Sequence, residues 1–182
     1  ALKILELRNK DFTPMLQKAL DDLYNRRIDA GTTTERYDKL QLARLLVQNL
    51  ANLNATDSTD RVFALYNEIS DPLLKSDCAI ALGKFRAKSY AYRLSRDLAD
   101  INLAGKDGDT RPQEIIAFGL VQALDSLRDP GSFQALFLAS IAWYPNNSRV
   151  KESARNALLK IFEDPTEQFA ELIQKHPELR VK

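Results

Sequence analysis

The sequence predicts an all-α fold, a right-handed α-solenoid (superhelix) of about four antiparallel helix pairs. Three observations support this expectation. A stripe of four apolar residues at steps of four, four and three recurs along the chain, and a second amphipathic segment lies between successive stripes. Only six glycines and seven prolines interrupt the 182 residues, and no strand pattern is evident. Because steps of three and four keep side chains on one face of an α-helix, each stripe indicates a helix with one buried side.

The clearest stripe consists of Leu74, Cys78, Leu82 and Phe85, and small alanines beside it would let a neighbouring helix approach closely. Three more stripes follow the same steps: Leu42, Leu46, Leu50, Leu53; Ile116, Leu120, Leu124, Leu127; and Val150, Ala154, Leu158, Ile161. Their third members are 32, 42 and 34 residues apart, which suits one helical hairpin per repeat. Most of these residues are expected to form one continuous core: Leu42, Leu46, Leu50, Leu74, Cys78, Leu82, Ile116, Leu120, Leu124, Val150, Leu158 and Ile161.

The segment Leu74–Gly83, LKSDCAIALG, resembles the second-helix signature of HEAT repeats, especially the short bilin-lyase-like kind. That signature has an apolar and a basic residue, two variable, two small and one variable residue, then Ala-Leu-Gly. A looser copy lies at Val150–Leu158, whereas the other two stripes carry alanine in place of the basic residue. The resemblance covers about Tyr37 to Pro165. It implies a single HEAT-like helical repeat domain over residues 1–182, complete or part of a longer array, and says little about function.

The first two helix pairs can be placed from their caps and breaks. We expect a first amphipathic helix from Phe12 to Ile28, and a partner helix that starts at Thr34 and reaches Leu53. Ser58 or Thr59 is expected to cap a short helix through Ile69. Asp71 followed by Pro72 then suits the start of the helix that carries the clearest stripe.

The later pairs follow the same logic. A helix is expected over Ala87–Leu103, then an exposed loop over Ala104–Arg111, which explains the wide 42-residue spacing. The next helix starts at Pro112. After a turn at Asp129-Pro130-Gly131, Ser132 is expected to cap Phe133–Tyr144 and Ser148 to cap Arg149–Phe162; a last helix ends at Lys175.

Charge and cysteine content exclude several function classes. The 26 basic and 25 acidic residues nearly cancel, so no overall field would draw the chain to nucleic acid or to an anionic membrane. One cysteine excludes an internal disulfide and a thiolate metal cluster. Cys78 lies on an apolar stripe and is predicted to be a buried core residue rather than a reactive thiol. No apolar run approaches the roughly 20 residues that a membrane span needs.

The start of the sequence bears on the compartment. The chain begins at Ala1 without an initiator methionine or a signal-like segment, so we expect a processed mature chain or an excised fragment. The compartment does not follow from the sequence. It would be cytoplasmic, or periplasmic or exported if Ala1 is a processed N-terminus.

In a HEAT-like stack, two positions on each second helix would face the concave side, opposite the core stripe. These ladder positions are Arg44 and Gln48, Ser76 and Ile80, Phe118 and Gln122, Glu152 and Asn156. The ladder is mixed in charge and has one aromatic side chain, whereas a phosphate backbone calls for several cations in register. We therefore expect a non-enzymatic protein-binding scaffold that binds a protein or peptide on this face, with rigid stacking lowering the ordering cost.

A second candidate surface is the segment Phe133–Tyr144, FQALFLASIAWY, which has almost no polar face. A helix that is apolar all round is normally buried all round. The alternative is that Leu138 and Trp143 lie on an uncovered face, where they would bind a partner or a second copy of the chain.

A basic run offers an alternative function, nucleic-acid binding. The run has two tyrosines interleaved and consists of Lys84, Arg86, Lys88, Arg93 and Arg96. Cations with aromatic side chains between them are typical of single-strand binding. The favoured interpretation is a solvated helix face, because Arg93 and Arg96 each precede an aspartate by four residues and can pair with it. Nucleic acid is therefore an unlikely partner in this interpretation.

We expect no catalytic residue, cofactor or metal. The only histidine, His176, lies in a polar C-terminal segment, whereas a zinc site or a catalytic triad needs a histidine in a preorganised core. No glycine-rich phosphate loop follows a strand. A bilin-lyase-like or glycosylase-like enzyme would need a concave pocket with a buried carboxylate such as Glu152 or Glu114. HEAT-like DNA glycosylases use a basic cleft, and the ladder is not basic.

Overall fold

The computed structural model describes residues 10–104, 108–162 and 166–175, and these residues are all-helical without a β-strand, as predicted. The nine α-helices within them are α2 (Thr13–Asn25), α3 (Thr33–Asn52), α4 (Thr59–Glu68), α5 (Pro72–Lys84), α6 (Ala91–Leu103), α7 (Arg111–Leu127), α8 (Phe133–Ile141), α9 (Arg149–Ile161) and α10 (Thr166–Lys175). Short 3₁₀-helices precede several of them. None of the helices in these ranges has the length and apolar character needed to cross a membrane.

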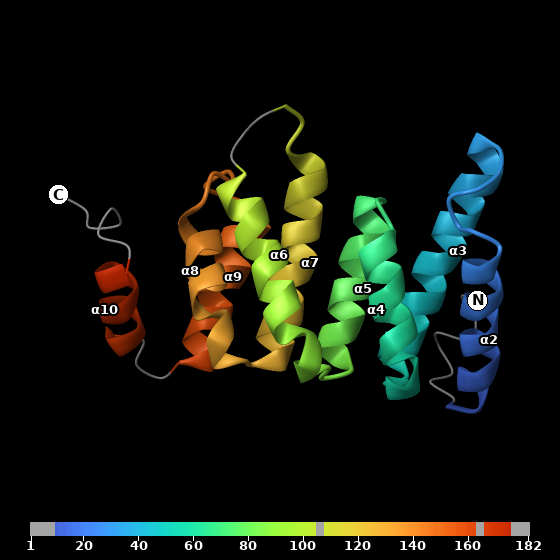
Figure 1. Cartoon of the computed structure of the whole chain (residues 1–182), viewed down its shortest axis with the longest axis horizontal. Helices are drawn as coiled ribbons and strands as arrows, with labels where there is room; N and C mark the ends of the chain where they lie inside the picture. Colours follow the sequence, from blue (N-terminus) through green and yellow to red (C-terminus); the bar gives the residue numbers. More distant parts are fainter. Residues whose placement is uncertain (1–9, 105–107, 163–165, 176–182) are drawn as a thin grey trace.

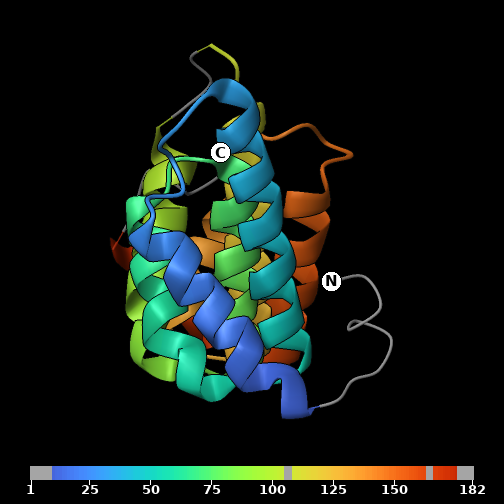
Figure 2. The same ribbon diagram turned by 90° about the vertical axis from the view of Figure 1, so that its right-hand side faces the viewer.

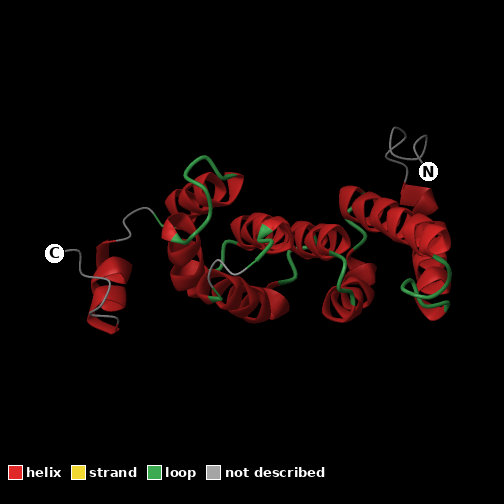
Figure 3. Ribbon diagram, turned by 90° about the horizontal axis from the view of Figure 1, so that it is seen from above, coloured by secondary structure: helices red, strands yellow, loops and turns green. Residues whose placement is uncertain are grey.

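The helices form a two-layered row (Figures 1 and 3). In one layer α3 packs against α5, α5 against α7 and α7 against α9; we call these four the inner helices. In the other layer α2 packs on α3, α4 on α5, α6 on α7 and α8 on α9. Consecutive helices of the row run in alternating directions, so the inner helices all point the same way (Figure 1). Figure 2 looks along the row from the N-terminal end, with α2 and α3 in front.

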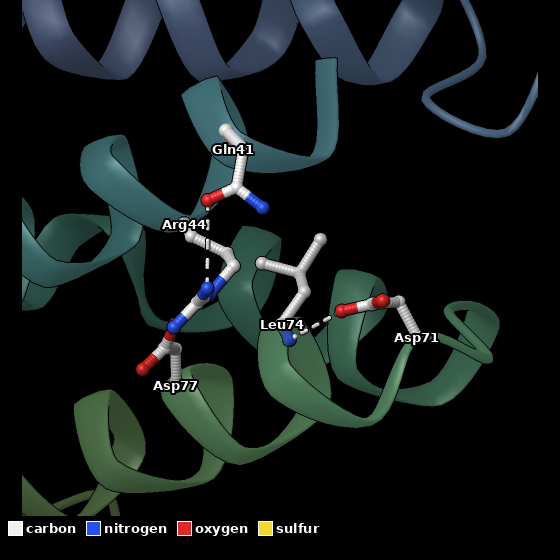
Figure 4. Close-up of polar contacts among 5 residues, drawn as sticks. All are labelled: Gln41, Arg44, Asp71, Leu74 and Asp77. Carbon is white, nitrogen blue, oxygen red and sulfur yellow. Dashed lines mark hydrogen bonds and ion pairs between the residues drawn. The ribbon is translucent and has the colours of Figure 1, made fainter. Parts of the chain in front are cut away.

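Side-chain caps start three of the inner helices. The Asp71 Oδ1 atom accepts a hydrogen bond of 2.8 Å from the Leu74 backbone N–H, with proline at the first helical position of α5 (Figure 4). Ser148 caps α9 by accepting from the Val150 N–H at 3.2 Å. Thr32 forms a capping box with Glu35 at the start of α3. The predicted caps of α5 and α9 are therefore confirmed, and each satisfies backbone donors that the helix itself leaves free.

Two predicted caps are wrong. Ser58 and Ser132 hold the N-cap positions of α4 and α8, yet neither side chain makes a capping hydrogen bond. The Ser58 Oγ atom accepts instead from Gln17 Nε2 at 3.0 Å, and the Ser132 Oγ atom accepts from Ser95 Oγ at 3.0 Å. The cap is absent because a 3₁₀-helix leads the chain directly into α4 and into α8. Each serine instead links its helix to the preceding outer helix.

The turn that follows the inner helices recurs along the chain. After α3, α5 and α7, one residue adopts a left-handed backbone, and a 3₁₀-helix then begins two residues later. The left-handed residues are Asn54, Arg86 and Arg128, with φ of 53°, 55° and 50°. The 3₁₀-helices are η2 (Thr56–Ser58), η3 (Lys88–Tyr90) and η4 (Pro130–Ser132). These positions are 32 and 42 residues apart, the spacing of the first three apolar stripes. The turn therefore recurs with the same spacing as these apolar stripes.

Most of the predicted core is confirmed. Nine of the twelve expected residues are buried, and Ile116 and Ile161 are partly buried against the same core. Leu42 was wrongly predicted to be buried, since 42% of it is exposed. In the part of the chain that the structure describes, α3 is the first inner helix, so its side opposite α5 has no inner helix to cover it.

Several helix ends differ from the predictions by a few residues. α2 ends at Asn25 instead of Ile28, and α6 begins at Ala91 because the preceding three residues form η3. α8 ends at Ile141, since Ala142 has a ψ of −178° that no α-helix allows. In the expected loop at residues 104–111, Ala104, Gly108 and Asp109 are exposed and Thr110 is half-buried, whereas Arg111 already begins α7. Residues 105–107 lie outside the described ranges.

Candidate functional site

The inner helices carry an exposed surface opposite their core stripes. On α5, Leu73, Asp77, Ile80 and Lys84 follow steps of four, three and four, and none of the four is buried. The same steps on α7 and α9 select further residues that are half-buried or exposed: Arg111, Ile115, Phe118 and Gln122 on α7, and Arg149, Ser153, Asn156 and Lys160 on α9. We call this face the inner surface. Two hollows lie on it, at opposite ends of the inner helices.

The first hollow, which we call the apolar groove, has a volume of about 480 Å³. It lies near the N-terminal ends of α5, α7 and α9 and is lined by Leu73, Ser76, Ile80, Ile115, Phe118 and Val150, with Asp77, Arg111, Glu114 and Arg149 among them. The structure therefore brings together three of the predicted ladder residues, but only Ile80 and Phe118 are half-buried. Ser76 was predicted to be presented on this face and is instead buried, because α5 approaches Gly119 of α7 there. The Arg149 guanidinium carbon lies 4.7 Å from the centre of the Phe118 ring, a cation–π contact that leaves Phe118 half-buried.

The carboxylates of the apolar groove already have partners within the chain. The Asp77 Oδ2 atom accepts from Arg44 Nε at 2.7 Å, an ion pair that ties α3 to α5 (Figure 4). The Glu114 Oε1 atom accepts from the Ser148 hydroxyl at 2.5 Å. Arg111 forms a 3.7 Å ion pair with Asp109 at the surface, and its backbone N–H donates to the Asp109 Oδ1 atom at 3.1 Å. Arg44 therefore neutralises Asp77 and contributes mainly to holding the helices together, whereas Glu114 keeps its negative charge because a serine hydroxyl is neutral.

The second hollow, which we call the basic pocket, has a volume of about 580 Å³ and lies at the C-terminal ends of the same helices. It is lined by Gly83, Lys84, Arg86, Lys88, Asp125, Ser126, Leu127, Arg128 and Lys160. Lys160 pairs with Asp125 at 2.7 Å, and Lys84 donates to the neutral Asn52 side chain at 2.8 Å. Among the described residues, Lys84, Arg86, Lys88 and Arg128 have no carboxylate within ion-pair distance.

The basic run of the sequence is split by the fold. Lys84, Arg86 and Lys88 line the basic pocket, whereas Arg93 and Arg96 lie on α6. Arg93 pairs with Asp97 at 2.9 Å as predicted, while Arg96 forms no ion pair in the ranges that the structure covers. The interleaved Tyr90 is not free to stack on a base, because its ring lies 3.8 Å from the Phe63 ring and its hydroxyl donates to Asp60.

Sequence reasoning missed Arg128 and Lys160. Arg128 occupies the same place in the repeated turn as Arg86, 42 residues earlier, so aligning the turns would have found it. Lys160 follows Asn156 on α9 by one helical turn. The ladder residues Gln48, Gln122 and Asn156 line neither hollow; Gln48 and Gln122 are half-buried, and Asn156 is exposed.

The segment Phe133–Tyr144 is mostly covered within the chain. α8 packs against α6 and α9, and the Phe133 and Phe137 rings also contact Phe169 of α10 at 5.2 and 5.0 Å. Trp143 lies beyond the end of α8, where its Nε1–H donates to the Ile101 carbonyl at 3.3 Å. Leu138 and Trp143 are partly buried and line neither hollow. The apolar character of this segment is therefore accounted for largely by packing.

The two carboxylates named for the enzyme alternative lie on α7 and α9. Glu114 is half-buried and Glu152 is exposed, so neither is the buried carboxylate that the enzyme alternative needs. Among the described residues no group of three His, Cys, Asp or Glu side chains could hold a metal ion. His176 lies outside the described residues. No protein-family model, curated protein or solved structure matches the chain.

Cys78 is completely buried in the core, and this burial raises the pKa of its thiol well above the usual range. We expect the folded protein to resist alkylation by iodoacetamide at neutral pH, because the thiolate is the reacting species and both burial and the raised pKa suppress it. After unfolding in guanidinium the thiol should react freely. Mass spectrometry of the alkylated protein checks this; fast labelling without denaturant would mean that α5 does not stay packed.

Proposed function

We propose that the chain is a HEAT-like, right-handed α-solenoid that acts as a non-enzymatic protein-binding scaffold. The packing of α3 on α5, of α5 on α7 and of α7 on α9 supports the stacked arrangement, because each inner helix contacts the next one and also its own outer helix. The repeated left-handed turn at Asn54, Arg86 and Arg128 supports it independently, since it repeats with the spacing of the apolar stripes.

The observation that carries the binding role is the apolar groove. Leu73, Ile80, Ile115 and Phe118 present apolar side chains at an open surface without being buried, although the chain has a continuous core elsewhere. A half-exposed aromatic ring in a shallow apolar hollow with arginines beside it is typical of the centre of a protein interface. The helices that line the groove, α5, α7 and α9, pack one on the next. A partner segment would therefore bind to a surface that is already ordered.

We predict that Phe118→Ala weakens partner binding by about 30-fold or more, the loss of roughly 2 kcal/mol expected when a central aromatic anchor is truncated. The probe is a random-peptide phage library selected against the wild-type chain, followed by fluorescence anisotropy with the selected peptides. Tyr92→Ala serves as the matched control, because Tyr92 is an aromatic residue on α6 that is 79% exposed. Circular dichroism checks that both variants keep their helicity.

Two results would contradict the scaffold proposal. One is the failure of the library to yield any peptide that binds the wild-type chain. The other is equal binding of the selected peptides to Phe118→Ala and to the wild type.

Nucleic-acid binding is the second candidate function, and the basic pocket is the observation that favours it. Its four cations without a carboxylate partner lie in a single hollow, while Arg93 and Arg96 lie on another helix. A nucleic-acid strand needs cations along a track, so the geometry favours protein. Affinity for a labelled oligonucleotide that falls steeply between about 50 and 200 mM salt would support this second candidate.

A further inference from the structure

We propose that the partner is a linear peptide segment that combines an apolar anchor with a cluster of acidic residues about four or five positions away. The anchor binds in the apolar groove and the carboxylates bind in the basic pocket. This inference rests on the proposed protein-binding function and adds the chemistry of the partner.

The two hollows are parts of one surface. On α5, Leu73 and Ile80 of the apolar groove lie on the same helical face as Lys84 of the basic pocket. Arg128, the first residue after α7, follows Phe118 by ten residues, about 15 Å along the helix axis at about 1.5 Å per residue. An extended chain advances about 3.3 Å per residue, so about four or five residues join the two hollows. One short segment can therefore occupy both.

The available charges select an acidic segment. Asp77 in the apolar groove is neutralised by Arg44, and Asp125 in the basic pocket is neutralised by Lys160. Glu114 is hydrogen-bonded to the neutral Ser148 hydroxyl and keeps its negative charge in the apolar groove, where Arg111 and Arg149 also lie. The remaining cations of the pocket, Lys84, Arg86, Lys88 and Arg128, have no carboxylate partner among the described residues. A ligand with carboxylates at this end is attracted, and one with cations is repelled, which gives the surface a polarity along the inner helices.

The repeated turn explains how the pocket forms. Arg86 and Arg128 occupy equivalent left-handed positions at the ends of α5 and α7, so the same turn directs an arginine into the same pocket from two successive inner helices. Asn54 holds the equivalent position after α3 and is uncharged. The basic pocket is thereby confined to the α5–α7–α9 part of the row, as is the apolar groove. Between the two hollows α7 presents Gln122, a half-buried amide that can hydrogen-bond a peptide backbone.

The test uses fluorescein-labelled synthetic peptides that carry a Leu-Phe pair, a Gly-Ser spacer and a run of glutamates, made in both chain directions. The spacer has about four residues, as the geometry requires. Matched peptides replace glutamate by glutamine, replace Leu-Phe by serine, or shorten the spacer to about one residue. We expect one direction of the parent peptide to bind, and each matched peptide to bind about tenfold more weakly or worse.

The protein variants separate the two hollows. Arg86→Glu with Arg128→Glu is expected to weaken the glutamate peptide by about tenfold or more and to leave the glutamine peptide unchanged. Arg26→Glu with Arg36→Glu is the matched control, since both arginines are exposed, form no ion pair among the described residues and lie outside both hollows. Phe118→Ala should weaken the glutamate and glutamine peptides alike.

The outcomes distinguish this inference from the proposed function. If binding depends on Phe118 but the glutamine peptide binds as well as the glutamate peptide, the acidic-partner inference is wrong while the scaffold proposal stands. If Phe118→Ala changes nothing and only charge reversal matters, both the two-site inference and the apolar groove as the binding site are wrong. Loss of affinity on shortening the spacer supports simultaneous occupation of both hollows.

Discussion

Truncation of Leu82 to alanine is expected to lower the free energy of unfolding by about 2–5 kcal/mol. Leu82 lies in the middle of α5, is completely buried, and belongs to the core that α5 shares with its neighbours. The truncation removes the packing contacts of the leucine methyl groups and leaves a cavity. Because α5 packs against α3, α4 and α7, these helices cannot move together to fill it. Thermal or urea unfolding followed by circular dichroism measures the loss, and Tm should fall by about 2–4 °C for each kcal/mol.

Leu103→Ala is the matched control for this truncation. Leu103 is 73% exposed at the end of α6, so the same chemical change should alter stability by no more than about 0.5 kcal/mol. Equal effects of the two truncations would show that α5 is not the central inner helix of the packed core.

Replacing Gly119 by alanine is expected to destabilise the protein by about 2 kcal/mol, although alanine is the better helix former by about 1 kcal/mol. A Cβ atom at Gly119 would lie 2.8 Å from the Ser76 Cα and carbonyl oxygen atoms. Because this neighbour is backbone, it cannot rotate away, and α5 and α7 must separate. Such overpacking costs about 1–3 kcal/mol or more, which outweighs the gain in helix propensity.

Gly83 offers an independent test of the close contact between α5 and α7. A Cβ atom there would lie 2.6 Å from the Ala123 Cα atom, so Gly83→Ala should also destabilise. Gln122 is half-buried on the inner surface of α7 and serves as the control. Gln122→Ala should change the free energy of unfolding, measured by chemical unfolding, by no more than about 0.5 kcal/mol. A stabilising effect of Gly119→Ala, as propensity alone dictates, would rule out the close approach of α5 and α7.

Much of the fold could be predicted from the sequence because helical periodicity is local. The steps of four, four and three identified α3, α5, α7 and α9, and nine of the twelve expected core residues are buried. Leu42 was missed because burial of a stripe residue also depends on whether a neighbouring helix exists on that side. The end of α8 and the roles of Ser58 and Ser132 were missed because the backbone of the turns does not follow from periodicity.

The candidate site was predictable in part for the same reason. Ile80 and Phe118 were placed on one surface because they lie opposite the core stripe, and the structure brings them into one groove. Ser76 was placed on the same surface but is buried, because burial there depends on the close approach of α7. The basic pocket was not predicted. Its cations come from the ends of three helices that are far apart in sequence, so a search for a continuous basic run included Arg93 and Arg96 and omitted Arg128 and Lys160.

The sequence by itself determined the all-helical class, the order of the helices and the side of each that is buried, because these depend on contacts within three or four residues. Only the tertiary structure decided which exposed residues lie together. The distance between α5 and α7, set by Gly83 and Gly119, and the turns at Arg86 and Arg128 bring separate helices to one groove and one pocket. Such neighbourhoods arise from packing between helices that are distant in sequence, and no local pattern in the chain records them.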